Sequence, residues 1–244
     1  SDQALQSAKK TLLIIGGSDA VLIMGLAVMA LIKPEAQWSI SQYHIPVFGG
    51  TAWLAFILVL IAALAKAGGF PLHTWLPDYA RDVPVEGAAL LPASLDKLLG
   101  IYLLARMLTT LFSVDMILNL ILMTLGAITV ITAVMMALVQ HNGRRLLGYH
   151  AVSQVGYMII GVSSGNPIAF AGGLFHLVNN TIYKSGLFLT LGSVEKQTGS
   201  SDLDDLGGLA RNMPITFLMA LIAALSISGI PPFNGFFSKW MIYQ

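Results

Sequence analysis

The sequence predicts an all-α polytopic membrane protein, on the evidence of its composition and of the length of its apolar runs. Among its 244 residues, 56% are hydrophobic and 10% are charged, whereas ordinary soluble domains carry about 25% charged residues. Apolar runs of about 20 residues recur along the chain, the length that crosses a hydrocarbon core of roughly 30 Å. Because lipid offers backbone groups no partners, every spanning segment must be a helix.

Charge and cysteine content exclude several classes of function. A net charge of +1 argues against nucleic acid as a partner. The sequence contains no cysteine, which removes thiolate metal sites, iron–sulfur clusters and disulfides. We therefore expect no bound cofactor or metal, and no catalytic site of its own, in this chain.

Seven to eight spans are expected within one transmembrane domain that covers residues 1–244. Residues 1–10 are polar and are expected to form a loop, and Asp19 interrupts the first apolar run. Pro214 occupies a favoured first helical position at the start of the last run. The chain stops inside an apolar run, as expected for a fragment or a split subunit. The expected spans are residues 11–32, 51–79 with a break, 86–112, 115–139, 147–163, 168–194 and 214–244 with a break, and the long loops are 33–48 and 195–212.

Two of these runs contain residues that break a helix, in the sequences LAKAGGFP and SISGIPPFNGFFSK. The breaks lie five spans apart, so alternating spans would place them in opposite directions through the membrane. Transporters built from inverted repeats have their binding sites at paired broken helices, although glycine and proline also occur where a helix only kinks. The predicted break residues are Gly68, Gly69, Pro71, Gly229, Pro231 and Pro232.

Polar side chains inside the predicted spans are the candidate functional residues. His176, Asn180 and Lys184 recur at i, i+4 and i+8 and form one stripe on a helix, which must face protein or water rather than lipid. Desolvation and nearby acids shift the pKa of a lysine in opposite directions, so a row of lysines joined by histidine, asparagine and water can relay protons. The remaining candidates are Lys66 before the first break, Lys97 near the middle of its span and Lys239 after the second break.

Each candidate also has a purely structural interpretation. A lysine near a helix end often extends to the membrane interface, which applies most to Lys66 and Lys239. A single histidine such as His176 is as readily a hydrogen-bonded interior residue as a relay. Asp96 and Lys97 are a possible neutral pair, although adjacent residues on a helix do not face each other. Weaker candidates are His73, His150, Glu86 and Asp19.

Four blocks of the sequence carry a family resemblance. LAKAGGFPLHTWLPDYARDVPVEGAALLPASLDKLLGIYLLARM, YHAVSQVGYMIIG, GGLFHLVNNTIYKSGLFLTLGSV and LSISGIPPFNGFFSKW occur in this order. They resemble the antiporter-like membrane subunits shared by respiratory complex I, Mrp-type cation/proton antiporters and membrane-bound energy-converting hydrogenases, and most closely the hydrogenase and Mrp branches. The resemblance implies that the chain is the central to C-terminal part of a longer subunit built from two inverted five-helix units.

The resemblance also implies roles for individual residues. Lys66, Lys184 and Lys239 match the lysines of the family's central proton path, with His176 and Asn180 on the same stripe. The chain departs from the family where a histidine is usual after the first break, because Pro92 stands there and Asp96 and Lys97 follow; Lys97 is then the expected bridging group. The family's acidic partner of Lys66 lies upstream of residue 1, and no residue of this chain is expected to replace it.

We therefore predict proton or sodium/proton translocation through a lysine and histidine relay, within an ion-translocating oxidoreductase (complex I-like or hydrogenase) or an Mrp antiporter. The expected partners are other membrane subunits, the lipid bilayer and a soluble redox arm. Two alternatives stay open: a structural membrane anchor without translocation, and a self-contained transporter of an organic solute. The second requires a substrate cavity between the breaks, and no aromatic or arginine cluster is seen there.

Basic residues predict the orientation in a prokaryotic cell membrane or an organellar inner membrane. If the spans alternate, one side has most of the lysines and arginines, and the positive-inside rule places it in the cytoplasm. Residue 1 and the 195–212 loop lie on this side. It collects Lys9, Lys10, Arg81, Arg144, Arg145, Lys196 and Arg211, against Lys33 and Arg106 on the other.

Overall fold

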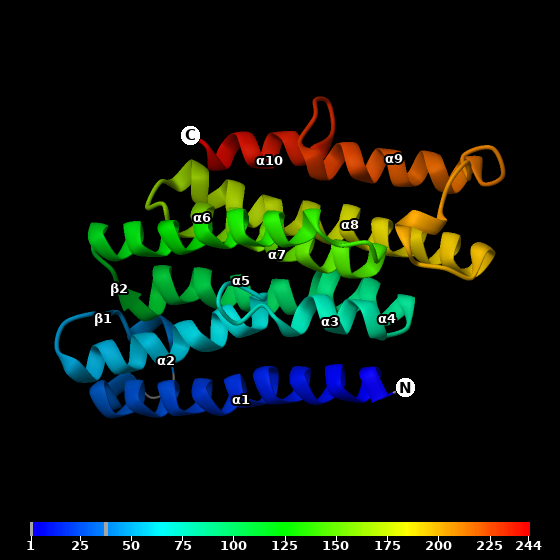
Figure 1. Cartoon of the computed structure of the whole chain (residues 1–244). Coiled ribbons are helices and arrows are strands. Elements are labelled where there is room, and N and C mark those ends of the chain that lie inside the picture. Colours follow the sequence, from blue (N-terminus) through cyan, green and yellow to red (C-terminus); the bar gives the residue numbers. More distant parts are fainter. Residues whose placement is uncertain (1, 37–38) are drawn as a thin grey trace.

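The computed structural model describes residues 2–36 and 39–244, and in these residues the fold is a bundle of long helices (Figure 1). Two π-helical segments, Leu91–Leu95 and Met107–Leu111, flank α5, and three short 3-10 turns lie at Pro34–Ala36, Ile40–Gln42 and Leu203–Asp205. Strands β1 (Ile45–Pro46) and β2 (Phe112–Ser113) form one short parallel pair. The helices are α1 Asp2–Ile32, α2 Gly50–Ala67, α3 Trp75–Asp82, α4 Val85–Leu90, α5 Asp96–Arg106, α6 Met116–Leu138, α7 Gly143–Ser163, α8 Pro167–Thr198, α9 Pro214–Ser228 and α10 Asn234–Ile242.

The all-α prediction is confirmed, but several helices are longer than expected. The loop expected at the N-terminus is wrong for residues 2–10, which belong to α1; residue 1 lies outside the described part of the chain. Alanine, leucine, glutamine and lysine in this stretch favour a helix, and Lys10 Nζ binds Asp78 Oδ2 at 2.8 Å. Helix α7 also begins earlier than predicted, because the Asn142 side chain caps it by accepting a hydrogen bond from the Arg145 N–H.

The second half of the first broken helix begins later than predicted. Helix α3 starts at Trp75 rather than at Pro71, because residues 68–74 form turns between the two half-helices. The next predicted span is continuous from Val85 to Leu111, but it contains the two π segments. Pro92 lies in the first of these and has no N–H to donate to the preceding turn, a local irregularity of a kind often found at functional sites.

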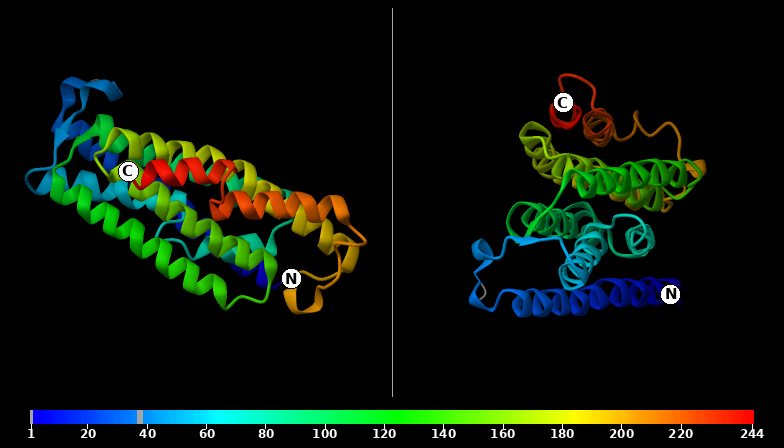
Figure 2. Two further views of the ribbon diagram at one scale, coloured as in Figure 1. Left: turned by 90° about the horizontal axis from the view of Figure 1, so that it is seen from above. Right: turned by 90° about the vertical axis from the view of Figure 1, so that its left-hand side faces the viewer.

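The helices pack in layers (Figure 1), and the layers cross at an angle, because the right-hand view of Figure 2 shows α1 lengthwise but α9 and α10 nearly end-on. Helix α1 packs on α2 and α3, α2 packs on α5, and α7 lies between α6, α8 and α3. The two halves of the second broken helix, α9 and α10, both pack on α8. The N-terminal end of α1 and the α8–α9 connection lie at one end of the bundle, and β1 and β2 lie at the other (Figure 1).

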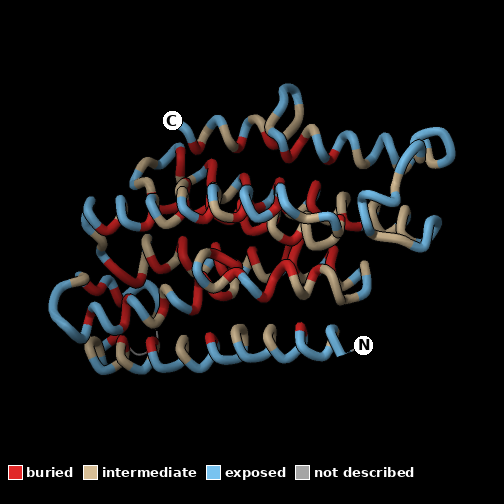
Figure 3. The backbone as a smooth tube through the Cα atoms, in the orientation of Figure 1, coloured by how far each residue is buried: buried red, intermediate tan, exposed pale blue. Residues whose placement is uncertain are grey.

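The outer surface of the bundle has the character of a lipid-facing surface. Four helices within the described residues are long and apolar enough to cross a membrane: Asp2–Ile32, Gly50–Ala67, Val85–Leu111 and Met116–Leu138. Large apolar side chains of α1 such as Leu12, Leu13 and Leu31 are more than two-thirds exposed. In Figure 3 the buried residues concentrate in the middle layers, whereas α1 and α9 are largely exposed. The chain is therefore an integral membrane protein, with its polar residues turned inward.

Glycines allow the inner helices to approach closely. A Cβ added to Gly156 on α7 would lie 2.5 Å from the Gly126 carbonyl oxygen on α6, and a Cβ added to Gly161 would lie 2.8 Å from the Cα of Gly173 on α8. Small residues at such crossings are typical of helices that pack inside a membrane. They bring α7 and α8 near enough for their polar side chains to interact directly.

Candidate functional site

The first helix break is a partly buried turn with hydrogen bonds to two neighbouring helices. Helix α2 ends at Gly68, which has the left-handed conformation (φ 77°, ψ 35°) that glycine adopts readily. The Trp75 indole donates a hydrogen bond to the freed carbonyl of Ala65 at 3.1 Å, and the N–H of Phe70 donates to Thr129 Oγ1 at 3.3 Å. Because every such group needs a partner inside a membrane, the broken helix is supported from both α3 and α6.

Lys66, in the last turn before this break, forms an ion pair with Asp19 of α1. This corrects the expectation that no residue of the chain replaces the acidic partner. The two residues are 47 positions apart, so their spacing along the sequence did not reveal the pair. The Lys66 side chain is 16% exposed and the Asp19 side chain 52%. Both line a cavity of about 530 Å³ between α1, α2 and α5, which lies beside the first break rather than between the two breaks.

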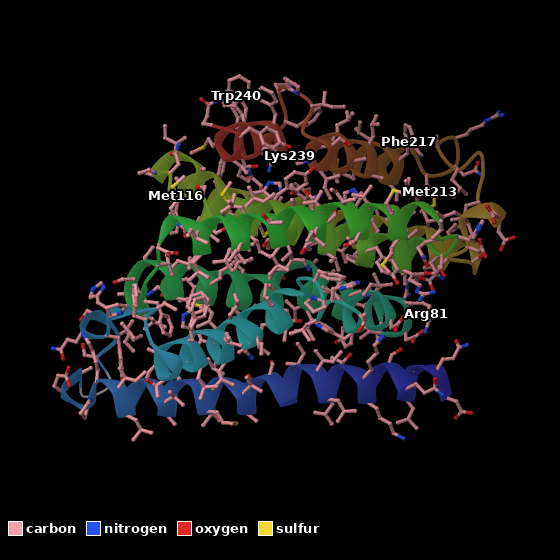
Figure 4. All side chains as sticks on the ribbon, turned by 60° about the vertical axis from the view of Figure 1, so that its left-hand side comes forward. Arg81, Met116, Met213, Phe217, Lys239 and Trp240 are labelled. Atoms are coloured by element: carbon pink, nitrogen blue, oxygen red, sulfur yellow. The ribbon has the colours of Figure 1, made fainter. Side chains whose placement is uncertain are left out.

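The second break has the same backbone geometry, but a lysine satisfies it. Helix α9 ends at Gly229 (φ 80°, ψ 37°), and Lys239 Nζ donates to the Ile227 carbonyl at 2.8 Å. A cation is favoured at the C-terminal end of a helix, where carbonyl groups are free. The ammonium also lies 4.9 Å from the centre of the Tyr157 ring. Figure 4 shows Lys239 toward the rest of the bundle, whereas its neighbour Trp240 lies on the outer face of α10.

Lys97 is fully buried, at the junction of the first π segment and α5. Its Nζ donates a hydrogen bond to the carbonyl of Pro92. Among the ion pairs of the described residues none joins Lys97 to Asp96, in agreement with the argument that adjacent residues on a helix do not face each other. The π segment therefore provides the carbonyl that holds the lysine.

The polar stripe of α8 faces protein along its whole length. His176, Asn180 and Lys184 are each 0% exposed. Asn180 Nδ2 donates to the Ala93 carbonyl in the π segment at 3.2 Å, which places the stripe beside the helix that carries Lys97. Within residues 2–36 and 39–244, Lys184 Nζ has no hydrogen-bond partner. A buried amine without a partner is costly to stability, and such groups are frequent at functional sites.

His176 is the most connected member of the stripe. Its Nδ1 lies 2.9 Å from Ser238 Oγ on α10, and its Nε2 lies 3.0 Å from Gln154 Oε1 on α7. The Tyr183 hydroxyl lies 3.4 Å from Nε2. Gln154 and Ser238 were not singled out in the sequence, although both lie within the blocks YHAVSQVGYMIIG and SISGIPPFNGFFSK.

The charged groups form one series of electrostatic contacts across the bundle. Asp96 interacts with both Lys66 and Lys97, and Lys97 interacts with Lys184. His176 lies on the same α8 stripe as Lys184 and interacts with Lys239 at the second break.

Two other histidines lie near the series. His150 of α7 interacts with Lys184 and Lys239, and its Nδ1 is buried without a hydrogen-bond partner within the described part of the chain, as is the Nδ1 of His73 at the first break. In the same part of the chain, no group of three or more His, Cys, Asp or Glu side chains could hold a metal ion.

Comparison with known proteins identifies the relatives of the chain. The model of the family described as "NADH:quinone oxidoreductase/Mrp antiporter, TM" matches residues 1–244. An uncharacterised protein of Methanocaldococcus jannaschii is 33% identical over 245 residues, covering 100% of this chain and 51% of that protein. One of the Na(+)/H(+) antiporter subunits of Alkalihalophilus pseudofirmus is 36% identical over 187 residues, covering 76% of this chain and 38% of that protein.

A solved structure shares the same fold. A chain of the Mrp complex from Dietzia sp. DQ12-45-1b superimposes with a TM-score of 0.91 at 28% sequence identity, covering 98% of this chain and 44% of that one. The chain thus spans about half the length, or less, of the relatives it matches.

Proposed function

Because the chain belongs to the NADH:quinone oxidoreductase/Mrp antiporter transmembrane family, we propose that it translocates protons, or protons against sodium ions, as part of an antiporter-like subunit. The subunit would work within a larger redox-driven or Mrp-type complex, since one of its relatives is a sodium/proton antiporter subunit and a chain of its fold belongs to an Mrp complex. Other membrane subunits, the bilayer and a soluble redox arm are its proposed partners.

The observation that carries the proposal is the series of lysines between the two helix breaks, of which two are fully buried. Lys97 and Lys184 are both 0% exposed on neighbouring helices and interact with each other. Two like charges in a bilayer interior are expensive, and a scaffold has no need of them. A lysine that alternates between ammonium and amine, however, can pass a proton on and is then neutral while the neighbouring lysine is charged.

The proposed path runs sideways through the bundle, from Lys66 at the first break to Lys239 at the second. Asp19 pairs with Lys66 at the start of the path, and the next member of the path is Lys97. Asn180 and His176 extend the path along α8. The cavity of about 530 Å³ beside Lys66 and Asp19 gives water a place to reach the first member of the series.

The proposed orientation places the N-terminal end of α1 and the α8–α9 loop in the cytoplasm. This loop begins at residue 199 rather than at the predicted residue 195, because α8 continues to Thr198. Ion pairs gather basic residues at this end of the bundle: Lys10 contacts Asp78 at 2.8 Å, Arg145 contacts the same carboxylate at 3.5 Å, and Arg144 contacts Glu195 at 2.5 Å. The positive-inside rule favours the cytoplasm for such an end.

Replacement of Lys66 or Lys184 by alanine in the intact complex tests the proposal. Pumping by the purified complex is measured in proteoliposomes with a pH-sensitive dye, beside assembly and, where a redox arm is present, electron transfer. The control is Lys9→Ala, because Lys9 is an exposed lysine of α1. We expect pumping to fall in both variants, with assembly intact and Lys9→Ala unaffected. Unchanged pumping in the assembled variants would instead support the structural anchor.

A further inference from the structure

We propose that Ser238 and Gln154 position His176 so that its Nε2 always carries a hydrogen and only its Nδ1 gains and loses a proton. The inference rests on the hydrogen bonds around the imidazole ring. It extends the proposed relay to Ser238 and Gln154, as residues that position His176. Both charge states of the imidazole then fit one arrangement of heavy atoms.

The orientation of the Gln154 amide follows from its other neighbour. The hydroxyl of Ser153 donates its single hydrogen to the His150 carbonyl at 2.9 Å, so Ser153 Oγ must accept the hydrogen bond from Gln154 Nε2 at 3.3 Å. The amide oxygen of Gln154 is consequently the atom that faces His176 Nε2, at 3.0 Å. Because a carbonyl oxygen only accepts hydrogen bonds, the Nε2 of the ring must be the donor.

Ser238 has two acceptors within reach of its one hydrogen. Its Oγ lies 2.9 Å from His176 Nδ1 and 3.2 Å from the Gly235 carbonyl oxygen. When the ring is neutral, the hydroxyl donates to Nδ1. When Nδ1 binds a proton and forms an N–H bond, that N–H donates to Oγ and the hydroxyl hydrogen rotates to the Gly235 carbonyl. No buried donor or acceptor of these described groups is left without a partner in either state, and only one hydrogen has to rotate.

The other groups around the His176 ring agree with Nδ1 as the nitrogen that gains and loses the proton. On α7 the Tyr157 ring lies 5.9 Å from the His176 ring, centre to centre. On α8 the Tyr183 hydroxyl lies 3.4 Å from His176 Nε2 and 3.5 Å from Gln154 Oε1. Because Nε2 already donates to Oε1, the hydroxyl donates to Oε1 as well. On α10 Lys239 is the charged residue with which His176 interacts. Nδ1 therefore faces α10, and a proton is exchanged on the side of the second break rather than on the side of α7.

Nitrogen-15 NMR of histidine-labelled protein, in its assembled complex in lipid, tests the inference directly. The chain has five histidines, so the signals of His176 are identified by their loss in His176→Asn. We expect Nε2 to be protonated at every pH, and the neutral ring to have a hydrogen-bonded, unprotonated Nδ1. A neutral ring protonated at Nδ1 would overturn the inference, whatever the complex transports.

Substitutions provide the second test, in which the transport readout rests on the proposed function. Ser238→Ala should remove the hydrogen-bond shift of Nδ1 and slow transport about tenfold, the factor that corresponds to about 1.4 kcal/mol, while Ser238→Thr restores both. The control is Ser163→Ala, a buried serine of α7 whose hydroxyl donates only within its own helix. An unchanged Nδ1 signal in Ser238→Ala contradicts the role of Ser238.

A variant of α7 keeps the inference testable if Ser238→Ala does not assemble. Gln154→Leu removes the acceptor at Nε2, and we expect a second neutral form, protonated at Nδ1, to appear in the spectrum. Nε2 protonation that persists alone in Gln154→Leu would show that Gln154 does not determine which nitrogen carries the hydrogen. If Lys184→Ala leaves transport intact while these spectra behave as expected, the relay fails and the hydrogen-bond assignment stands.

Discussion

Replacing Lys184 by methionine should stabilise the protein and at the same time abolish transport. Lys184 Nζ is fully buried and, among the described residues, makes no hydrogen bond. A buried polar group without a partner costs about 1–3 kcal/mol, whereas an apolar replacement of similar volume usually costs less than about 1.5 kcal/mol. At the middle of these two ranges the net gain is about 1 kcal/mol, which corresponds to a rise of roughly 2–4 °C in the unfolding midpoint for a chain of this length.

The assay compares unfolding midpoints and pumping rates of the same preparations of the complex in lipid nanodiscs and proteoliposomes. We expect Lys184→Met to unfold at a higher temperature and to pump at least about a hundredfold more slowly, the contribution typical of one acid–base group. Lys196→Met is the matched control, because Lys196 is an exposed lysine of the same helix; its stability should stay within about 0.5 kcal/mol of the wild type. A lower midpoint in Lys184→Met, or wild-type pumping, would refute the view of Lys184 as a functional residue retained at the expense of stability.

Three further predictions follow from the contacts. Asp19→Asn removes the negative charge from the ion pair with Lys66, which is partly exposed. Because such pairs contribute up to about 1 kcal/mol, we expect pumping to fall up to about fivefold, with Asp19→Glu close to wild type. Equal pumping rates in all three proteins would argue against a role for the pair. Gly156→Ala places a Cβ 2.5 Å from a carbonyl oxygen of α6 and should destabilise the protein by about 1–3 kcal/mol, whereas Gly207→Ala, which meets open space, should not change the unfolding midpoint. Because the chain has no cysteine, Ser200→Cys and Lys33→Cys can each be labelled with an impermeant maleimide, and we expect labelling from the cytoplasmic and the opposite side respectively; labelling from the same side would contradict the proposed topology.

Much of the fold was predictable because a membrane-spanning helix requires a long apolar run, which can be recognised in the sequence. Apolar runs of spanning length indicated the positions of α2, α6 and α9 with small errors at their ends, and that of α1 apart from its polar first turns. Asn142, a capping residue, was a signal for the early start of α7 that the apolar pattern alone did not convey. The π segments were not predicted, since a proline inside an apolar run is equally compatible with a simple kink.

The candidate site was predictable in its residues and not in its contacts. A lysine or histidine within an apolar run is conspicuous, so Lys97, Lys184 and His176 could be selected from their positions. Gln154 and Ser238 are uncharged and occur in many helices, and only their distances of 3.0 Å and 2.9 Å from the ring of His176 make them candidates. The sequence contains no comparable signal for side chains whose importance depends on a neighbour from another helix.

The sequence by itself determined the membrane character, the helices, the two glycine and proline breaks and the buried cations, because each is a property of a single segment in a solvent of low polarity. The tertiary structure decided which charges meet. Asp19 and Lys66 lie on different helices, and their ion pair exists only because α1 packs against α2. Hydrogen bonds and ion pairs act over a few ångströms, and the packing of helices brings together residues that are distant along the chain.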